Sequence, residues 1–76
     1  MWSGRRFQLK EQILATEVVN SERIARYIAK GEIVTVTRGP RPDDVRLVDL
    51  LWGDRYITVF AVDLEARGDE VAAGNS

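Results

Sequence analysis

The sequence predicts an all-β or mainly β domain. The expected architecture is a small barrel or curled antiparallel sheet of about five strands, with a short helical turn after the last hairpin. Two observations lead to this fold class. Residues 45–64 contain two β-rich runs on either side of Gly53-Asp54. Residues 32–37 hold two Val, one Ile and two Thr in six positions, which is typical of a strand.

Length and composition indicate one small domain. We expect residues 1–4 to form a flexible N-terminus, residues 5–68 the single β-barrel domain, and residues 69–76 a disordered polar tail. The chain of 76 residues buries a modest core. It has no Cys and no His, which excludes disulfides and removes the commonest metal ligand and catalytic base. Among the usual ways to stabilise so small a domain, association with another subunit remains.

The first strands are expected within residues 5–19, where no Gly or Pro occurs. Residues 7–10 alternate apolar and polar side chains, as a half-buried strand does. Residues 12–19 continue with four aliphatic side chains and Thr16, which also suits a strand. The region predicts either one long bent strand or two short ones.

Residues 22–30 allow two interpretations. As a helix, the segment places Ile24, Tyr27 and Ile28 at positions i, i+3 and i+4, with Ser21 as cap and Gly31 as stop. As a strand, it alternates between two faces, and Lys30-Gly31 forms a tight turn into the next strand. The alternative fold class is therefore α+β, with one helix near residues 22–30.

Gly53-Asp54 predicts a hairpin over residues 45–64, because Gly at the first central position takes the positive φ of a type II′ turn. A two-residue turn pairs Trp52 with Arg55 and continues back to Val45 opposite Val62. Asp49 and Thr58 then form a polar cross-strand pair. After the hairpin, residues 63–68 predict one helical turn, with Asp63 as cap and Gly68 as stop.

This register makes both hairpin faces apolar, whereas a hairpin exposed on one side alternates apolar and polar residues. One face carries Arg46, Val48, Leu50, Trp52, Arg55, Ile57, Val59 and Ala61. The other contains the residues that we predict as an interface: Val45, Leu47, Leu51, Tyr56, Phe60 and Val62. The sheet covers one face, and the second needs a terminal segment, a helix or another molecule. The sequence therefore predicts a homo-oligomer or a module that binds a protein partner.

Residues 30–36, with the sequence Lys-Gly-Glu-Ile-Val-Thr-Val, resemble the basic-Gly-acidic-aliphatic turn of SH3-like small β-barrels. A loop rich in Pro and Asp, a hairpin and a short helical turn follow in the same order over residues 38–68. The two ends of the chain also resemble small uncharacterised bacterial proteins of similar length. The resemblance implies a fold, and a fold does not determine a function.

The sequence contains no catalytic motif. Without His or Cys, a nucleophile and its base would have to come from Lys or carboxylates, and the isolated glycines form no phosphate-binding loop. We therefore predict a non-enzymatic protein without cofactor or metal. The chain contains no apolar run of the length of a signal peptide or a transmembrane helix, so we expect no membrane association and a cytoplasmic location.

An accessory nucleic-acid-binding protein is the alternative function. Residues 1–41 contain eight basic and four acidic residues, whereas residues 42–76 contain three basic and eight acidic ones. The candidate patch consists of Arg5, Arg6, Arg38 and Arg41, with Trp2, Trp52 or Tyr27 available to stack on bases. The net charge of −1 is unlike the strongly basic surface of most such proteins.

Overall fold

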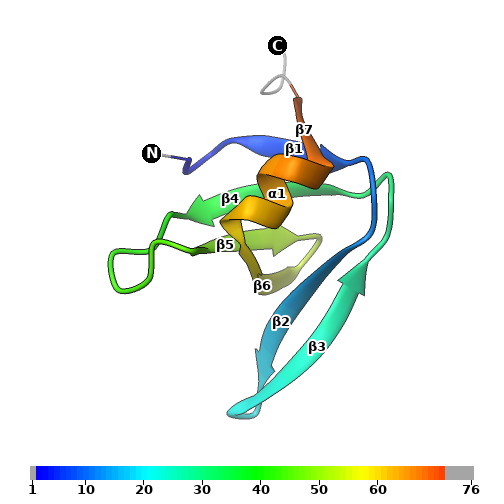
Figure 1. The fold of residues 1–76 in the computed structure, drawn as a ribbon. Helices are drawn as coiled ribbons and strands as arrows, with labels where there is room; N and C mark the ends of the chain where they lie inside the picture. Colours follow the sequence, from blue (N-terminus) through cyan, green and yellow to red (C-terminus); the bar gives the residue numbers. More distant parts are fainter. Residues whose placement is uncertain (1, 72–76) are drawn as a thin grey trace.

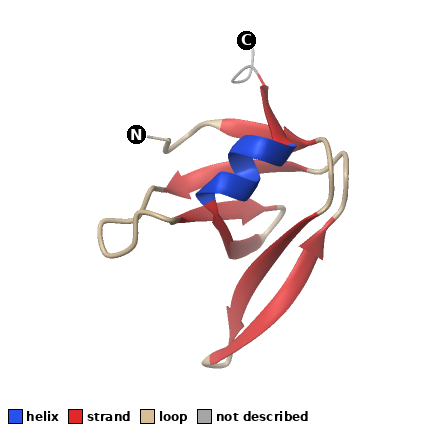
Figure 2. Ribbon diagram, in the orientation of Figure 1, coloured by secondary structure: helices blue, strands red, loops and turns tan. Residues whose placement is uncertain are grey.

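One antiparallel sheet dominates the computed structural model, which describes residues 2–71 (Figures 1 and 2). Within these residues it has seven strands: β1 (Arg6–Leu9), β2 (Ile13–Val19), β3 (Glu22–Ile28), β4 (Ile33–Arg38), β5 (Leu47–Trp52), β6 (Arg55–Phe60) and β7 (Gly68–Val71). The single helix, α1 (Ala61–Arg67), follows β6. The strand order is β3-β2-β6-β5-β4-β1-β7, so β3 and β7 are the edges of an open sheet. The mainly β class is confirmed, with seven strands rather than about five.

The N-terminal region forms two short strands, one of the two predicted possibilities. β1 pairs with β4 and β7, whereas β2 pairs with β3 and β6. Lys10 to Gln12 connect β1 to β2 and redirect the chain from one side of the sheet to the other (Figure 1).

Residues 22–28 are a strand, so the α+β alternative is wrong. Asn20 and Ser21 form the two-residue connection between β2 and β3, and both have positive φ, 51° and 68°. Such a pair of φ values fits the hairpin turns whose twist matches that of the strands they connect. The turn sets Leu14 opposite Tyr27 and Val18 opposite Arg23.

The β5–β6 hairpin has the predicted register from Leu47–Phe60 to Trp52–Arg55. Gly53 has a φ of 62°, as the predicted turn requires. The predicted pairing of Val45 with Val62 is wrong, because the strand ends at Phe60 and the chain turns into α1.

The helix also begins earlier than predicted. Phe60 is its N-cap residue and makes no side-chain capping bond, while Asp63 lies in the first turn. A carboxylate there interacts favourably with the helix dipole, which explains why Asp63 indicates a helix in the sequence although it is not the N-cap residue. Gly68 is the C-cap, as predicted.

Both ends of the described chain are held more firmly than predicted. Residues 69–71 belong to β7, which pairs with β1, and Arg5 forms two hydrogen bonds of 2.8 and 3.0 Å to the Glu70 carboxylate. Trp2 packs against the core and its backbone N–H donates to the Gly39 carbonyl. Met1 and residues 72–76, also predicted as flexible or disordered, lie outside the described residues.

The core lies on the inner, concave face of the sheet and is closed by α1. It consists of Phe7, Leu9, Ile13, Ala15, Ile28, Val34, Val36, Val48, Leu50, Ile57, Val59, Ala61 and Leu64. Leu64 of α1 is completely buried, and the helix contacts β1, β2, β6 and β7. The chain therefore covers one face of its sheet with its own residues.

Candidate protein interface

The two faces of the β5–β6 hairpin have different surroundings. Val48, Leu50, Ile57 and Val59 belong to the inner face and are buried. On the outer face, Tyr56 is 70% exposed and Phe60 is 47% exposed, while Leu47 and Leu51 are half-buried. No described segment of the chain covers this outer face.

The outer apolar surface continues from β6 onto β2 and β3. The pairing of Thr16 with Thr58 places these side chains on the same face as Leu14 and Val18 of β2, and Tyr27 lies opposite Leu14 on β3. Leu14, Val18 and Tyr27 are 44%, 64% and 64% exposed. We use the term outer face for the surface formed by Leu14, Val18, Tyr27, Leu47, Leu51, Tyr56 and Phe60.

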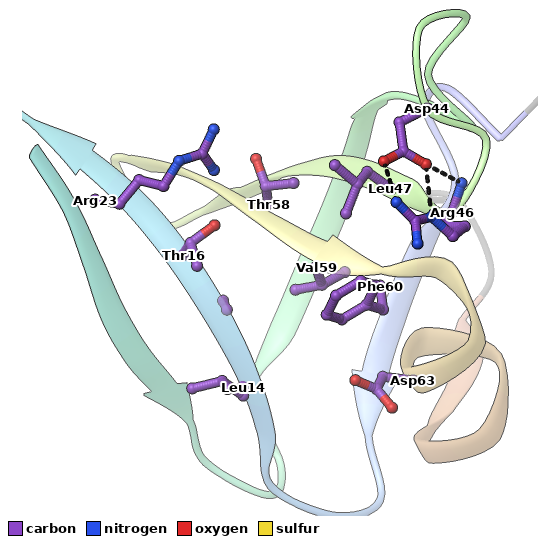
Figure 3. A pocket seen from close by; sticks show the side chains of 11 residues that line it. Leu14, Thr16, Arg23, Asp44, Arg46, Leu47, Thr58, Val59, Phe60 and Asp63 are labelled. Atoms are coloured by element: carbon purple, nitrogen blue, oxygen red, sulfur yellow. Dashed lines mark hydrogen bonds and ion pairs between the residues drawn. The ribbon is translucent and has the colours of Figure 1, made fainter. Parts of the chain in front are cut away.

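A groove crosses the outer face where β2 and β6 separate. These two strands share a single pair, Thr16 with Thr58, and beyond it they diverge towards Leu14 and Phe60 (Figure 3). The groove has a volume of about 340 Å³. Ala15 and Val59, which otherwise face the core, line it as well, so the opening extends between the strands.

Four charged side chains border the groove, and two of them neutralise each other. The Arg46 guanidinium donates to both carboxylate oxygens of Asp44, at 3.0 and 2.9 Å, and the Arg46 backbone N–H donates to the same group at 3.1 Å. These hydrogen bonds from Arg46 lower the pKa of Asp44 from 3.8 to about 2. Arg23 and Asp63 form no ion pair with any other residue in the range 2–71.

A second hollow, of about 390 Å³, lies beside the first at the polar centre of the face. Here Thr58 Oγ1 donates to Asp49 Oδ1 at 2.8 Å, and Arg38 donates to Asp49 Oδ2 at 3.2 Å. The predicted Asp49–Thr58 pair is confirmed as a hydrogen-bonded cross-strand pair. Thr58, Asp49 and Arg38 satisfy one another by these hydrogen bonds, so the hollow offers a ligand fewer free donors and acceptors than the sequence alone indicates.

One charged cluster lies on the inner face, at the end of the sheet away from α1. Glu17 is buried and accepts hydrogen bonds from Arg26 at 2.8 Å and from Arg55 at 3.1 and 3.2 Å. Burial alone raises the pKa of Glu17. The hydrogen bond from Arg26 and the charge of Arg55 outweigh it, so this pKa lies below its ordinary value.

The structure divides the predicted interface residues into two groups. Leu47, Leu51, Tyr56 and Phe60 lie together on the outer face of the hairpin. Val45 precedes β5 and Val62 lies on α1; they are 71% and 68% exposed but are not part of a strand pair.

The four arginines of the predicted nucleic-acid patch do not form one uncompensated cluster. Arg5 bonds to Glu70 and lies over the rings of Trp2 and Phe7, with its guanidinium carbon 5.4 and 5.3 Å from their centres. Arg38 and Arg41 both approach Asp49, at 3.2 and 3.8 Å. Arg6 lies on β1, opposite Thr35 and Val71.

Sequence reasoning left out the part of the outer face that β2 and β3 contribute. Leu14, Val18 and Tyr27 carry the signal, since they alternate with buried positions in two strands joined by a two-residue break. Writing the register across Asn20-Ser21 places them on one face, as Gly53-Asp54 does for the other hairpin.

No group of three acidic, His or Cys side chains in residues 2–71 is arranged to hold a metal ion. No helix in the same range has the length and apolarity needed to cross a membrane. No family model, curated protein or solved structure matches this chain, so its function has to be inferred from its own residues.

Proposed function

We propose that this protein is a small non-enzymatic assembly module that binds another protein molecule, a second copy or a different partner, through its outer face. The observation that carries the proposal is the gathering of exposed Leu14, Val18, Tyr27, Tyr56 and Phe60 on one face of the sheet. Single exposed apolar side chains are common, whereas a contiguous exposed set marks an interaction surface.

The energetics of burial support this proposal. Complete burial of one large apolar side chain stabilises a protein by roughly 1.5–3 kcal/mol. The whole free energy of unfolding of a small domain is about 5–15 kcal/mol. Covering several outer-face side chains in a complex would therefore add a contribution comparable with the stability of the isolated chain.

We also propose that the fold is a variant of the SH3-like barrel. In support, β4, the loop of residues 39–46, the β5–β6 hairpin and α1 follow in the order that the resemblance implies. The β2–β3 hairpin continues the sheet beyond β6, and the total of seven strands in the described residues exceeds the about five of that plan. This hairpin contributes three of the seven outer-face residues, Leu14, Val18 and Tyr27, so the proposed function depends on it as well as on the β5–β6 hairpin.

A non-enzymatic role agrees with the chemistry of the groove. The surface that lines it is mainly apolar, the Asp44–Arg46 pair is internally satisfied, and the sequence has no His or Cys. We propose a cytoplasmic location, without a cofactor. The nucleic-acid alternative gains no support, because Arg5, Arg38 and Arg41 each approach a carboxylate.

Light scattering on Phe60→Asp tests the proposal. Asp is a favoured N-cap residue and Phe60 is the uncapped N-cap of α1, so this substitution supports the helix while it places a charge on the outer face. We expect wild-type protein to associate at micromolar concentrations and Phe60→Asp to remain a folded monomer.

Ile33→Asp is the matched control. Ile33 is 42% exposed on β4, two strands away from β6, so the same substitution there should leave association nearly unchanged. If the wild-type protein is a monomer at all concentrations, self-association is rejected. If it also retains no partner protein that Phe60→Asp fails to retain, the outer face is rejected as a binding surface.

A further inference from the structure

The groove between β2 and β6 has a charge pattern that is complementary to itself. We propose, building on the function proposed above, that the molecule covering the outer face is a second copy of this chain. The two copies are related by a two-fold axis, and Arg23 of each copy meets Asp63 of the other.

The charged groups around the groove point to this partner. Its border carries two basic and two acidic side chains, Arg23, Arg46, Asp44 and Asp63, so its net charge is zero. Arg46 and Asp44 are paired with each other by two hydrogen bonds, so their charges are already neutralised within the chain. Arg23 and Asp63 remain as one positive and one negative group without an ion-pair partner in residues 2–71.

Figure 3 shows where these two groups lie. Arg23 extends from β3 at one corner of the groove, and Asp63 lies on the first turn of α1 at the diagonally opposite corner. Thr16, Val59 and Phe60 lie between them. The groove therefore has a positive end, an uncharged centre and a negative end.

Two-fold symmetry converts this pattern into complementarity. In such an interface, if residue i contacts residue j of the partner, residue j also contacts residue i. An axis in the plane of the interface, perpendicular to the line from Arg23 to Asp63, places each positive end on a negative end. One geometric operation thus forms two ion pairs.

The apolar content fits the same arrangement. Val59 and Phe60 lie between the two charged ends and Leu14 lies to one side of them, so these apolar side chains would form the centre of the interface and the ion pairs its rim. Known interfaces have this division into an apolar core and a polar rim. A strongly acidic or basic partner, including a nucleic acid, would find no net charge to complement.

An interface of standard size would take only a modest share of the chain's exposed surface. An interface of standard size covers about 800 Å² of each partner. The chain exposes 4920 Å² in total, and the outer face extends over four strands of the sheet.

Charge reversal and its rescue test the two-fold pairing. Sedimentation equilibrium would compare the dissociation constants of Arg23→Asp, Asp63→Arg and the double variant with that of the wild type. Each single variant brings like charges together twice, so we expect its dissociation constant to rise by about tenfold or more. The double variant exchanges the two ends and should return to within about threefold of the wild type.

Two further variants keep the test decisive. Asp54→Arg, an equal charge change in the β5–β6 turn, should leave the dissociation constant unchanged. If circular dichroism shows that Asp63→Arg is unfolded, Asp63→Asn replaces it in the test, because it adds no positive charge to the first turn of α1. It should weaken dimerisation by a few fold and reduce its dependence on salt.

The outcomes separate this inference from the proposed function. Weakening by both single variants with rescue in the double variant supports the two-fold pairing. If the double variant stays as weak as the single variants, or if no charge variant differs from Asp54→Arg while Phe60→Asp is monomeric, the pairing is overturned and the outer-face interface stands. If Phe60→Asp associates like the wild type, both are overturned.

Discussion

The inner and outer faces of the β5–β6 hairpin are built from similar side chains but have different environments. Leu50 and Val48 on the inner face are completely buried, whereas Tyr56 and Phe60 on the outer face are largely exposed. Both faces follow from one register and one turn at Gly53. The comparison shows that apolar character alone does not decide which face forms the core.

The position of the neighbouring elements makes the difference. α1 and the curvature of the sheet bring Leu64, Phe7 and Val34 over the inner face. On the outer face, β2 and β3 extend the surface sideways without covering it. The long β2–β3 hairpin thus enlarges the surface that is available to a partner.

Leu50→Ala on the inner face should have the largest effect on stability. Its side chain is completely buried, and substitutions of this kind cost about 2–5 kcal/mol, including the cavity that they leave. Urea unfolding of dilute, monomeric protein measures this change. Tyr56→Ala on the outer face is the matched comparison and should change the free energy of unfolding by less than about 1 kcal/mol. Equal losses would mean that the faces do not differ as described.

Acid should destabilise the inner face through Glu17. Its folded-state pKa lies below the ordinary value of 4.5, because Arg26 and Arg55 stabilise the carboxylate against the effect of burial. Its stabilising contribution is therefore complete above pH 4.5 and is lost as the pH falls through the folded-state pKa. Asp44, with a pKa of about 2, extends the same trend to lower pH.

Unfolding curves measured between pH 7 and pH 3 check this sign. The free energy of unfolding should fall below about pH 4.5 in the wild type. Glu17→Gln should start from a lower stability, and its free energy of unfolding should fall less with acid because Glu17 no longer titrates. Some fall should remain, because Asp44 and Glu70 still titrate. Stability that increases as the pH falls would contradict the assigned direction.

The two hairpin turns provide the smallest expected effects. Gly53 has a φ of 62° and open space around an added Cβ, so Gly53→Ala should cost about 1–2 kcal/mol through backbone strain alone. Ser21 has a φ of 68° with a side chain already present, so Ser21→Gly relieves that strain and should stabilise the chain by about 0.5 kcal/mol after the added entropy of Gly. Thermal unfolding measures both changes, and effects of the same sign would contradict the account of the turns.

Local signals made the hairpins predictable. Gly53-Asp54 determines the pairing of Leu47–Phe60 because a two-residue turn permits one register. The strand at residues 22–28 was one of two interpretations, since Ile24, Tyr27 and Ile28 also fit a helix. Its pairing with β2 through the Asn20-Ser21 turn decides in favour of the strand.

The remaining features depend on contacts between residues that are distant in the sequence. Gly68, Asp69 and Glu70 have little strand propensity, and they belong to β7 because β1 presents a pairing edge and Arg5 a partner for Glu70. The candidate interface drawn from the sequence included Tyr56 and Phe60 but not Leu14 and Tyr27, whose common face with β6 depends on the Thr16–Thr58 pair. That pair joins strands about 40 residues apart, so no local pattern reports it.

The central claim is that another protein molecule covers the outer face. Hydroxyl-radical labelling of Tyr56 as a function of protein concentration tests this claim for the case in which that molecule is a second copy of the chain. In the single chain this ring is 70% exposed. The account predicts that Tyr56 is protected at high concentration, becomes reactive on dilution, and stays reactive at every concentration in Phe60→Asp. Equal reactivity of wild-type Tyr56 at all concentrations would contradict self-association through this face.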